Sequence, residues 1–77
     1  MKRMNLLEMN IQVGKKYRLF YGKGHPMNKL MHIRAIVDKE YIVFRWYGKH
    51  KQWWHYQIEC RFFFELNMKN NTLKEVK

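Results

Sequence analysis

The sequence has little cysteine, few acidic residues and no long hydrophobic run. Cys60 is the single cysteine among 77 residues, which excludes an internal disulfide and a four-cysteine zinc site. A lone thiol fits a reducing compartment, so a cytoplasmic location is expected. No apolar stretch approaches the roughly 20 residues of a membrane span. Asn5, Glu8 and Asn10 interrupt the apolar residues near the N-terminus, so no signal peptide is expected.

Acidic residues are scarce, and their distribution is uneven. Against 16 Lys and Arg the chain has 6 Asp and Glu, which gives a formal net charge of +10. No acid lies between Glu8 and Asp38, and none lies from Tyr41 to Ile58. Because self-repulsion of this kind destabilises a compact domain, the surplus indicates a polyanionic partner. That partner is either nucleic acid or the acidic surface of another protein.

Aromatic side chains are abundant, and they supply the core that a short chain needs. A domain of this length buries only about 60% of the surface of its unfolded chain. The three Trp, five Tyr and five Phe of the sequence each bury roughly 150–250 Å². Packing therefore explains most of the aromatic content, and only rings that face away from the core are candidates for binding.

Residues 13–66 have the composition of strands separated by turns. Aromatic and β-branched residues dominate this range, and its Gly, Pro and charged clusters predict the breaks. The predicted strands are at about 15–21, 29–37, 41–47, 52–58 and 62–66. Residues 1–12 are predicted to be an N-terminal arm or a short helix, and residues 67–77 a frayed, flexible tail.

The alternation of apolar residues predicts the register of three strands. Val37 opposite Ile42 places the apolar residues of the second and third strands on one face. Trp46 opposite Trp54, across a loop of about five residues, extends this face into the fourth strand. The side chains that this register places in the core include Phe44, Trp46, Trp54, Tyr56 and Ile58.

A meander of five short strands, with a long first loop and tight later turns, resembles a small SH3-like β-barrel. The likeness covers residues 13–66 and includes the short gap Glu59–Arg61 before the predicted last strand. The architecture is similar to that of Tudor, chromo-like and KOW modules. The resemblance implies an all-β fold, a five-stranded antiparallel SH3-like barrel. Such barrels bind nucleic acids, peptides or other proteins, so the fold does not choose the ligand.

The side chains opposite the predicted core form an aromatic and basic face. The register places Arg34 beside Arg45 with His55 beyond, although like charges directly opposite in a sheet are unfavourable by about 0.2–1 kcal/mol. Guanidinium groups beside exposed rings suit a phosphate backbone with stacked bases, and they also suit protein carboxylates. Alternatively, the N-terminal segment covers this face. The candidate binding residues are Arg34, Arg45, Tyr47, Trp53, His55 and His32, with Lys23, Lys49 and Lys51 in two predicted loops.

The histidines do not form a recognisable metal site. His32 and His55 share the predicted outer face, but no thiol or carboxylate is clearly placed beside them, and zinc needs three or four ligands. Neither a metal nor another cofactor is expected. His55, Arg45 and Glu59 supply the residue types of a small ribonuclease of the kind found in bacterial toxins, which is the third hypothesis for function.

The leading hypothesis is a non-enzymatic module that binds DNA or RNA through the aromatic-basic face. The second is a protein-interaction module that covers an acidic or nucleic-acid-binding surface, such as an inhibitor of a host defence protein encoded by a virus or mobile element. The Gly-Lys-Gly of residues 22–24 can expose N–H groups to an anion, but it lacks the spacing of a P-loop. Bound nucleotide is therefore not expected.

Overall fold

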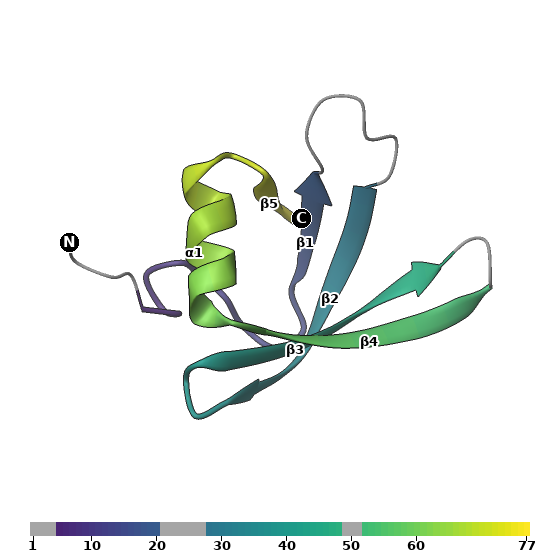
Figure 1. Cartoon of the computed structure of the whole chain (residues 1–77), viewed down its shortest axis with the longest axis horizontal. Helices are drawn as coiled ribbons and strands as arrows, with labels where there is room; N and C mark the ends of the chain where they lie inside the picture. The colour runs from purple at the N-terminus through teal and green to yellow at the C-terminus, as the bar shows by residue number, and fades with distance from the viewer. Residues whose placement is uncertain (1–4, 21–27, 49–51) are drawn as a thin grey trace.

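The computed structural model describes residues 5–20, 28–48 and 52–77. This part of the chain forms a sheet of five antiparallel strands and one short helix (Figure 1). In chain order the elements are β1 (Lys16–Phe20), β2 (Asn28–Val37), β3 (Tyr41–Gly48), β4 (Trp53–Cys60), α1 (Arg61–Lys69) and β5 (Leu73–Val76). The predicted all-β class with five antiparallel strands is confirmed.

The sheet is open at two edges. Its strand order is β4-β3-β2-β1-β5, and each neighbouring pair is antiparallel. Within residues 5–20, 28–48 and 52–77, no ladder joins β4 to β5, so these strands do not close into the predicted barrel. In Figure 1 the β3–β4 hairpin crosses the lower half of the molecule, and α1 lies above its left end.

The predicted fifth strand, residues 62–66, is wrong, because this segment lies in α1. Consecutive phenylalanines favour a strand by intrinsic preference, but a short apolar run does not distinguish a strand from a buried helix. Phe64 is fully buried, and Met68 packs against the core one turn later. Phe62 and Leu66 are exposed. Phe64 and Met68 thus lie on one side of the segment and Phe62 and Leu66 on the other, which is the spacing of a helix. Burial of Phe64 favours this helix over the predicted strand.

The predicted frayed tail, residues 67–77, is also wrong. The segment first completes α1 and then forms β5, which pairs antiparallel with β1. Leu73 is buried at the start of β5. Before it, the hydroxyl of Thr72 donates to Asn67 Oδ1 at 2.7 Å and turns the chain back from the helix. The strand forms because β1 offers an unpaired edge, which the composition of the tail does not reveal.

The N-terminal residues 5–11 form turns that join the core. The N–H of Glu8 donates to Asn5 Oδ1 at 2.8 Å, and Leu6, Met9 and Ile11 are buried. The described part of the predicted arm therefore packs in the core cluster. It does not cover the aromatic-basic face, which was the alternative that the sequence left open.

Tyr17 ties these turns to β1. Its hydroxyl donates to the backbone oxygen of Asn10. Burial and, to a smaller extent, the charge of Glu75 raise the pKa of Tyr17 to about 12. The hydroxyl therefore remains a donor at neutral pH.

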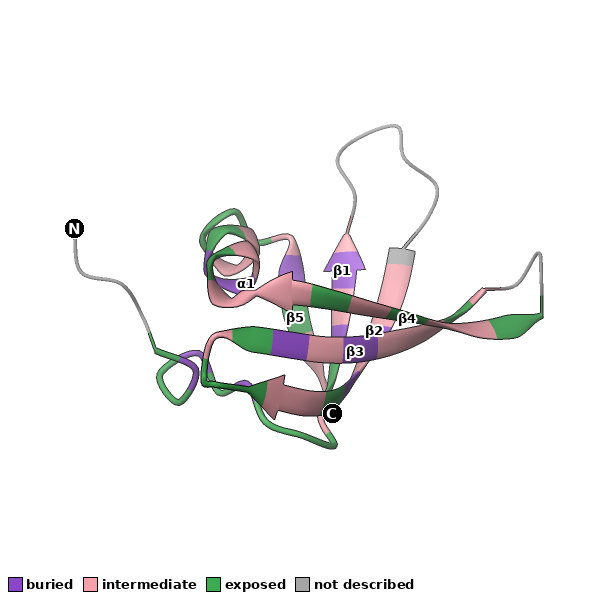
Figure 2. Ribbon diagram, turned by 60° about the horizontal axis from the view of Figure 1, so that its bottom comes forward, coloured by how far each residue is buried: buried purple, intermediate pink, exposed green. Residues whose placement is uncertain are grey.

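One face of the sheet, the inner face, packs against α1 and residues 5–11 (Figures 1 and 2). The opposite side is called the outer face. The most deeply buried side chains are Tyr17, Met31, Ile33, Ile42, Phe44 and Phe64. Phe44 is thus a core residue, as predicted, and Trp46 is partly buried against the same cluster.

A bulge in β2 changes the predicted pairing with β3. Ile33 lies opposite Phe44, but Ile36 lies opposite Ile42, and the register shifts between Ile33 and Ala35. A bulge inserts one residue into one strand of a pair. It therefore allows Ile33 and Ile36, three positions apart, to face the core together. The predicted pairing of Val37 with Ile42 is wrong because apolar alternation alone does not include this extra residue.

Candidate functional site

The register of the β3–β4 hairpin decides which aromatic side chains leave the core. Trp46 lies opposite His55 and Tyr47 opposite Trp54, so the predicted pairing of Trp46 with Trp54 is wrong by one residue. Such a slip moves every side chain of a strand to the other face. The predicted core residues that lie instead on the outer face are Trp54, Tyr56 and Ile58, of which Tyr56 and Ile58 are 61% and 55% exposed.

Beyond Trp53 the inner side of β4 is polar, which explains why the register predicted from apolar alternation is wrong. Gly48 pairs with Trp53, so the connecting loop has four residues, and His55, Gln57 and Glu59 take the inner positions. The amide of Gln57 donates to Glu59 Oε1 at 3.1 Å. The sequence favoured the other register because it would bury more aromatic surface. An edge strand tolerates polar residues on its inner side, since each of its residues remains partly accessible to solvent.

Arg45 and Trp54 form the centre of the outer face. Arg45 Cζ lies 4.1 Å from the centroid of the Trp54 ring, and Arg45 Nη1 donates to the Tyr56 hydroxyl at 3.2 Å. His32 and Tyr47 both meet Trp54 in T-shaped contacts, at centroid distances of 5.3 and 5.4 Å. Tyr47 is 50% exposed. These five residues are called the Arg45–Trp54 cluster, and its tyrosine rings remain accessible to a ligand.

Basic side chains continue the cluster across the sheet. In the strand ladder His32 lies between Arg45 on β3 and Lys16 on β1. Two positions along β1 from Lys16, Arg18 lies opposite Lys74 of β5. Lys16 and Lys74 are exposed. The cations therefore extend over the outer face from β3 to β5.

Acidic side chains in the described strands lie on the other face. Glu59 is opposite Ile42 and Glu75 is opposite Tyr17, and both partners are buried inner-face residues. Glu40, in the turn before β3, forms an ion pair with Arg61 at 3.5 Å. The strand positions of the described outer face thus carry positive charge without a carboxylate.

His32 lies within this positive potential and is itself partly buried. Burial lowers the pKa of His32 below its usual value of 6.5, and the cations of Lys16, Arg45 and Arg34 lower it further. Arg34 is exposed at the β2 bulge, so it adds to the positive potential although it is not opposite Arg45. An anion bound here would offset the charges that disfavour the imidazolium.

Replacing Lys16 by glutamine should raise the pKa of His32, because one of the neighbouring cations is removed. The wild-type pKa should lie below 6.5, so stability should fall as the pH drops from about 6.5 towards this lowered value, where the unfolded chain binds the proton first. Proton NMR titration of the imidazole measures the pKa directly. Lys39→Gln, an equal charge change in the β2–β3 turn, should leave it unchanged. An equal shift in both variants would contradict a local effect.

The structure brings together four of the predicted site residues and separates two others. Arg34, Arg45, Tyr47 and His32 lie on or beside the outer face, although the predicted row of Arg34, Arg45 and His55 is wrong because Arg45 is opposite His32. Trp53 and His55 lie on the inner side of β4, opposite Gly48 and Trp46. The predicted site residues that fall outside the described part of the chain are Lys23, Lys49 and Lys51.

His55 and Trp53 contribute to a different surface. The rings of His55 and Trp46 stack with centroids 5.3 Å apart, and Lys29 Nζ lies 4.0 Å from the Trp46 centroid. Trp53 is 71% exposed at the far end of the hairpin. It is accessible, as predicted, but it faces away from Arg45.

Five aromatic or basic residues of the outer face were not among the binding residues predicted from the sequence. Trp54 and Tyr56 were assigned to the core by the wrong hairpin register. Lys16 and Arg18 alternate with the buried Tyr17 and Leu19, so a test of period 2 along the first strand would have identified them. Lys74 was missed because its strand was predicted to be a tail.

The residue types suggested for a ribonuclease do not meet. Arg45 lies on the outer face, whereas His55 and Glu59 lie on the inner face of β4. Among residues 5–20, 28–48 and 52–77, no group of three His, Cys, Asp or Glu side chains could hold a metal ion. In the same ranges, no helix has both the length and the apolar character needed to cross a membrane.

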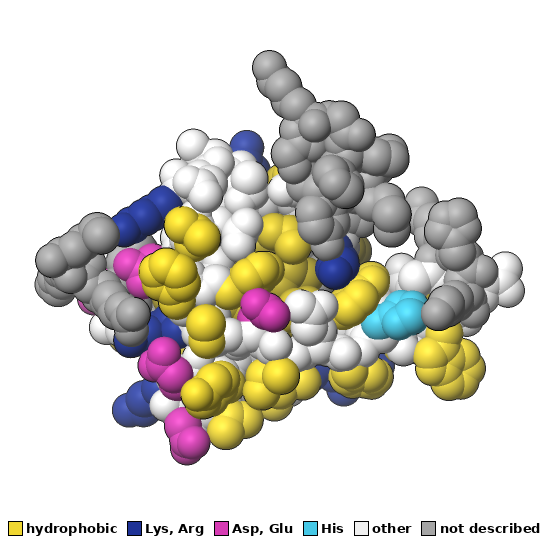
Figure 3. Space-filling model, viewed as in Figure 1, with side chains coloured by type: hydrophobic (Ala, Val, Ile, Leu, Met, Phe, Trp, Pro, Cys, Tyr) yellow, Lys and Arg dark blue, Asp and Glu magenta, His cyan; other side chains and the backbone are white. Residues whose placement is uncertain are grey.

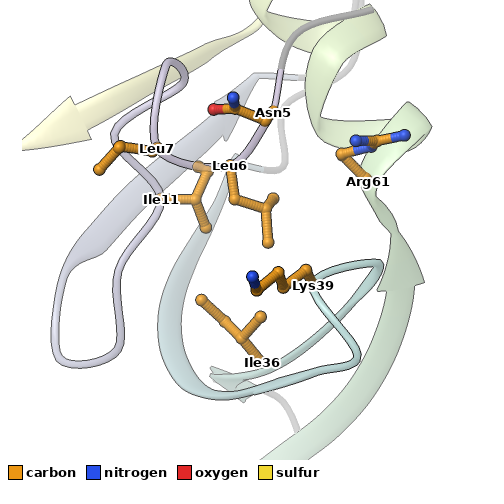
Figure 4. Close-up of a pocket in the computed structure, with 7 residues that line it drawn as sticks. All are labelled: Asn5, Leu6, Leu7, Ile11, Ile36, Lys39 and Arg61. Carbon is orange, nitrogen blue, oxygen red and sulfur yellow. The ribbon is translucent and has the colours of Figure 1, made fainter.

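A groove of about 520 Å³ opens between residues 5–11, the β2–β3 turn and the start of α1 (Figure 4). Leu6, Ile11 and Ile36 supply apolar walls, and Lys39 and Arg61 add two cations. The groove lies on the side of the sheet that carries α1, away from the Arg45–Trp54 cluster. No sequence pattern predicted it.

None of the comparisons with protein-family models, curated proteins and solved structures gives a match to this chain. The function of the candidate site is therefore inferred from the geometry and chemistry of its own residues.

Proposed function

We propose that this protein is a non-enzymatic module that binds nucleic acid through the outer face of its sheet. The observation that supports this most strongly is the Arg45–Trp54 cluster, a guanidinium held among aromatic rings and flanked by cations. Its position on a sheet face free of acidic strand residues in the described chain adds to the argument. The likeness to SH3-like modules, which bind nucleic acids, peptides or other proteins, is compatible with this proposal but does not choose among these ligands.

The two kinds of side chain on this face have separate roles. Lys16, Arg18 and Lys74 would neutralise phosphates, which supplies affinity that weakens with salt. Tyr47 and Tyr56 present exposed rings on which unpaired bases can stack, at roughly 1–3 kcal/mol per base. Because the bases of a duplex are stacked on one another, this combination favours single-stranded DNA or RNA as the ligand.

Charge and stacking can be tested separately by fluorescence anisotropy with a labelled oligonucleotide at several salt concentrations. Lys16→Gln should weaken binding and reduce the slope of log K against log salt by about 0.7–0.9 for each phosphate that the variant no longer neutralises. Tyr47→Ala should weaken binding by roughly 1–3 kcal/mol with little change in slope, because stacking is not ionic.

Two matched variants locate the surface. Lys39→Gln removes the same charge as Lys16→Gln, and Trp53→Ala removes an exposed ring from the inner side of β4. Both should retain most of the wild-type affinity. Equal losses of affinity in these controls would place binding elsewhere. If the wild-type protein binds neither single strands nor duplex at low salt, the nucleic-acid proposal is wrong and an acidic protein partner becomes the leading alternative.

A further inference from the structure

The free edge of β4 has few of the features by which proteins usually protect an edge strand. Natural edges are shortened, bulged or supplied with lysine or proline, because unpaired strand edges otherwise recruit another strand. β4 has eight residues, Trp53–Cys60, with the sequence WWHYQIEC. It contains no lysine, arginine or proline, and its ladder with β3 runs without a register shift. Glu59, near the end of the strand, is its one inward-pointing charge. In the described chain, β4 pairs with β3 alone.

The side chains of β4 are also poorly buried. Every residue of β4 is at least partly exposed (Figure 2). Trp53, Tyr56 and Ile58 are 71%, 61% and 55% exposed. Figure 3 shows hydrophobic side chains gathered along the band that the β3–β4 hairpin occupies in Figure 1. Exposed apolar side chains next to a free strand edge are characteristic of an interaction surface.

The distribution of charge indicates which edge of the sheet a second copy could approach. The chain has a net charge of +10, so two copies repel each other over most of their surface. At β4 this repulsion is smallest, because Glu59 is its one residue with a formal charge. The other edge, β5, carries Lys74 beside Lys16 and Arg18 of β1. A second copy can therefore approach at β4 more readily than at β5.

We propose that β4 pairs antiparallel with β4 of a second copy, which produces a symmetric dimer with one continuous ten-stranded sheet. A two-fold axis at Tyr56 aligns Tyr56 with its own counterpart and Trp54 with Ile58. Paired residues of antiparallel strands point to the same face, so both outer faces join across the axis. This alignment places aromatic and aliphatic side chains opposite each other, which stabilises a sheet, and it opposes no like charges. The interface is isologous, the commonest form of homodimer.

In the dimer, the outer faces of the two copies would form one continuous candidate binding surface. Tyr56 accepts a hydrogen bond from Arg45, so alignment at Tyr56 brings both Arg45–Trp54 clusters next to the axis. The pairing itself depends on the edge of β4 and does not depend on nucleic acid. It can therefore be tested on the protein alone.

Sedimentation velocity over a range of concentrations should give a species of twice the chain mass of 9.7 kDa. Ile58→Lys places a cation at the edge and should shift the protein to monomer. Val37→Lys makes the same change at an exposed residue of β2, which is not an edge strand, and should leave the dimer intact. Circular dichroism establishes that each variant is folded.

A cross-link tests the alignment without relying on a destabilising change. Across the axis, paired Cα atoms lie about 4.5–5.5 Å apart, within the range that a disulfide spans. In a Cys60→Ser background, Tyr56→Cys should form covalent dimers on oxidation, whereas Tyr47→Cys on β3 should not. A wild-type monomer at all concentrations would overturn the proposal, even if β4 then accepted an extended peptide from another protein. A dimer that persists in Ile58→Lys, or that fails to cross-link at position 56, would also overturn it.

Discussion

Phe64→Ala should destabilise the protein by about 3–5 kcal/mol, the usual cost of removing a buried phenylalanine ring. Phe64 is 0% exposed, and its ring meets Phe44 and Phe63 in T-shaped contacts at 6.0 and 5.5 Å. It therefore joins α1 to the centre of the sheet. Because small domains have total stabilities of about 5–15 kcal/mol, the variant should be unfolded or close to unfolding. Urea denaturation followed by tryptophan fluorescence measures the loss of stability.

Phe62→Ala is the matched control, since it removes the same ring from the exposed side of the same helix. Its effect should be much smaller, in line with the roughly 0.5 kcal/mol of an ordinary surface substitution. The comparison tests the helical assignment itself. A strand over residues 62–66 would place Phe62 and Phe64 on one face, and comparable destabilisation in the two variants would contradict the helix.

Deletion of residues 73–77 should prevent stable folding, although the composition of this segment suggests a dispensable tail. Leu73 is 5% exposed, and loss of a buried leucine side chain costs about 2–5 kcal/mol. The deletion also removes the ladder between β5 and β1, where each hydrogen bond contributes about 0.5–1.5 kcal/mol. It leaves β1 as an open edge, so aggregation should accompany unfolding.

Thermal unfolding followed by circular dichroism, together with the yield of soluble protein, measures this effect. Leu73→Asp provides a point variant with the same expected direction, because it places a carboxylate in the core. Lys74→Ala, at an exposed neighbouring position, should retain wild-type stability. A truncated protein with an unchanged melting temperature would show that β5 contributes little to the fold.

The local order of strands and turns could be predicted from the residues because its causes are local. β1 to β4 fall close to their predicted positions, since aromatic and β-branched residues favour strands and glycine and charged clusters mark the turns. The interior of β3 was also predictable. Ile42 and Phe44 are buried, while Tyr41 and Tyr47 are exposed, as strict alternation requires.

The sequence does not decide which side chains of β4 turn toward the core, because the first two residues of the strand, Trp53 and Trp54, are both aromatic. Either register turns one of them to the inner side of the sheet, and the two registers differ by a single loop residue. The structure selects the register in which Trp54 packs beside Arg45 on the outer face. The expected class of site, aromatic and basic, therefore remains, but its residues change: Trp54 and Tyr56 enter, and Trp53 and His55 leave.

Composition and pattern alone establish a small, strongly basic, all-β domain with four of its strands in place, but not its core, which is mostly aliphatic apart from Tyr17, Phe44 and Phe64. They also predict that one face of the sheet combines cations with rings. The helical state of residues 61–69, the pairing of β5 with β1 and the slip between β3 and β4 depend on contacts between distant parts of the chain. The chain adopts the tertiary arrangement that buries Phe64 and Leu73 and pairs the edge of β1, and this arrangement determines those contacts. Because that choice is made by the whole core at once, no short stretch of sequence contains it.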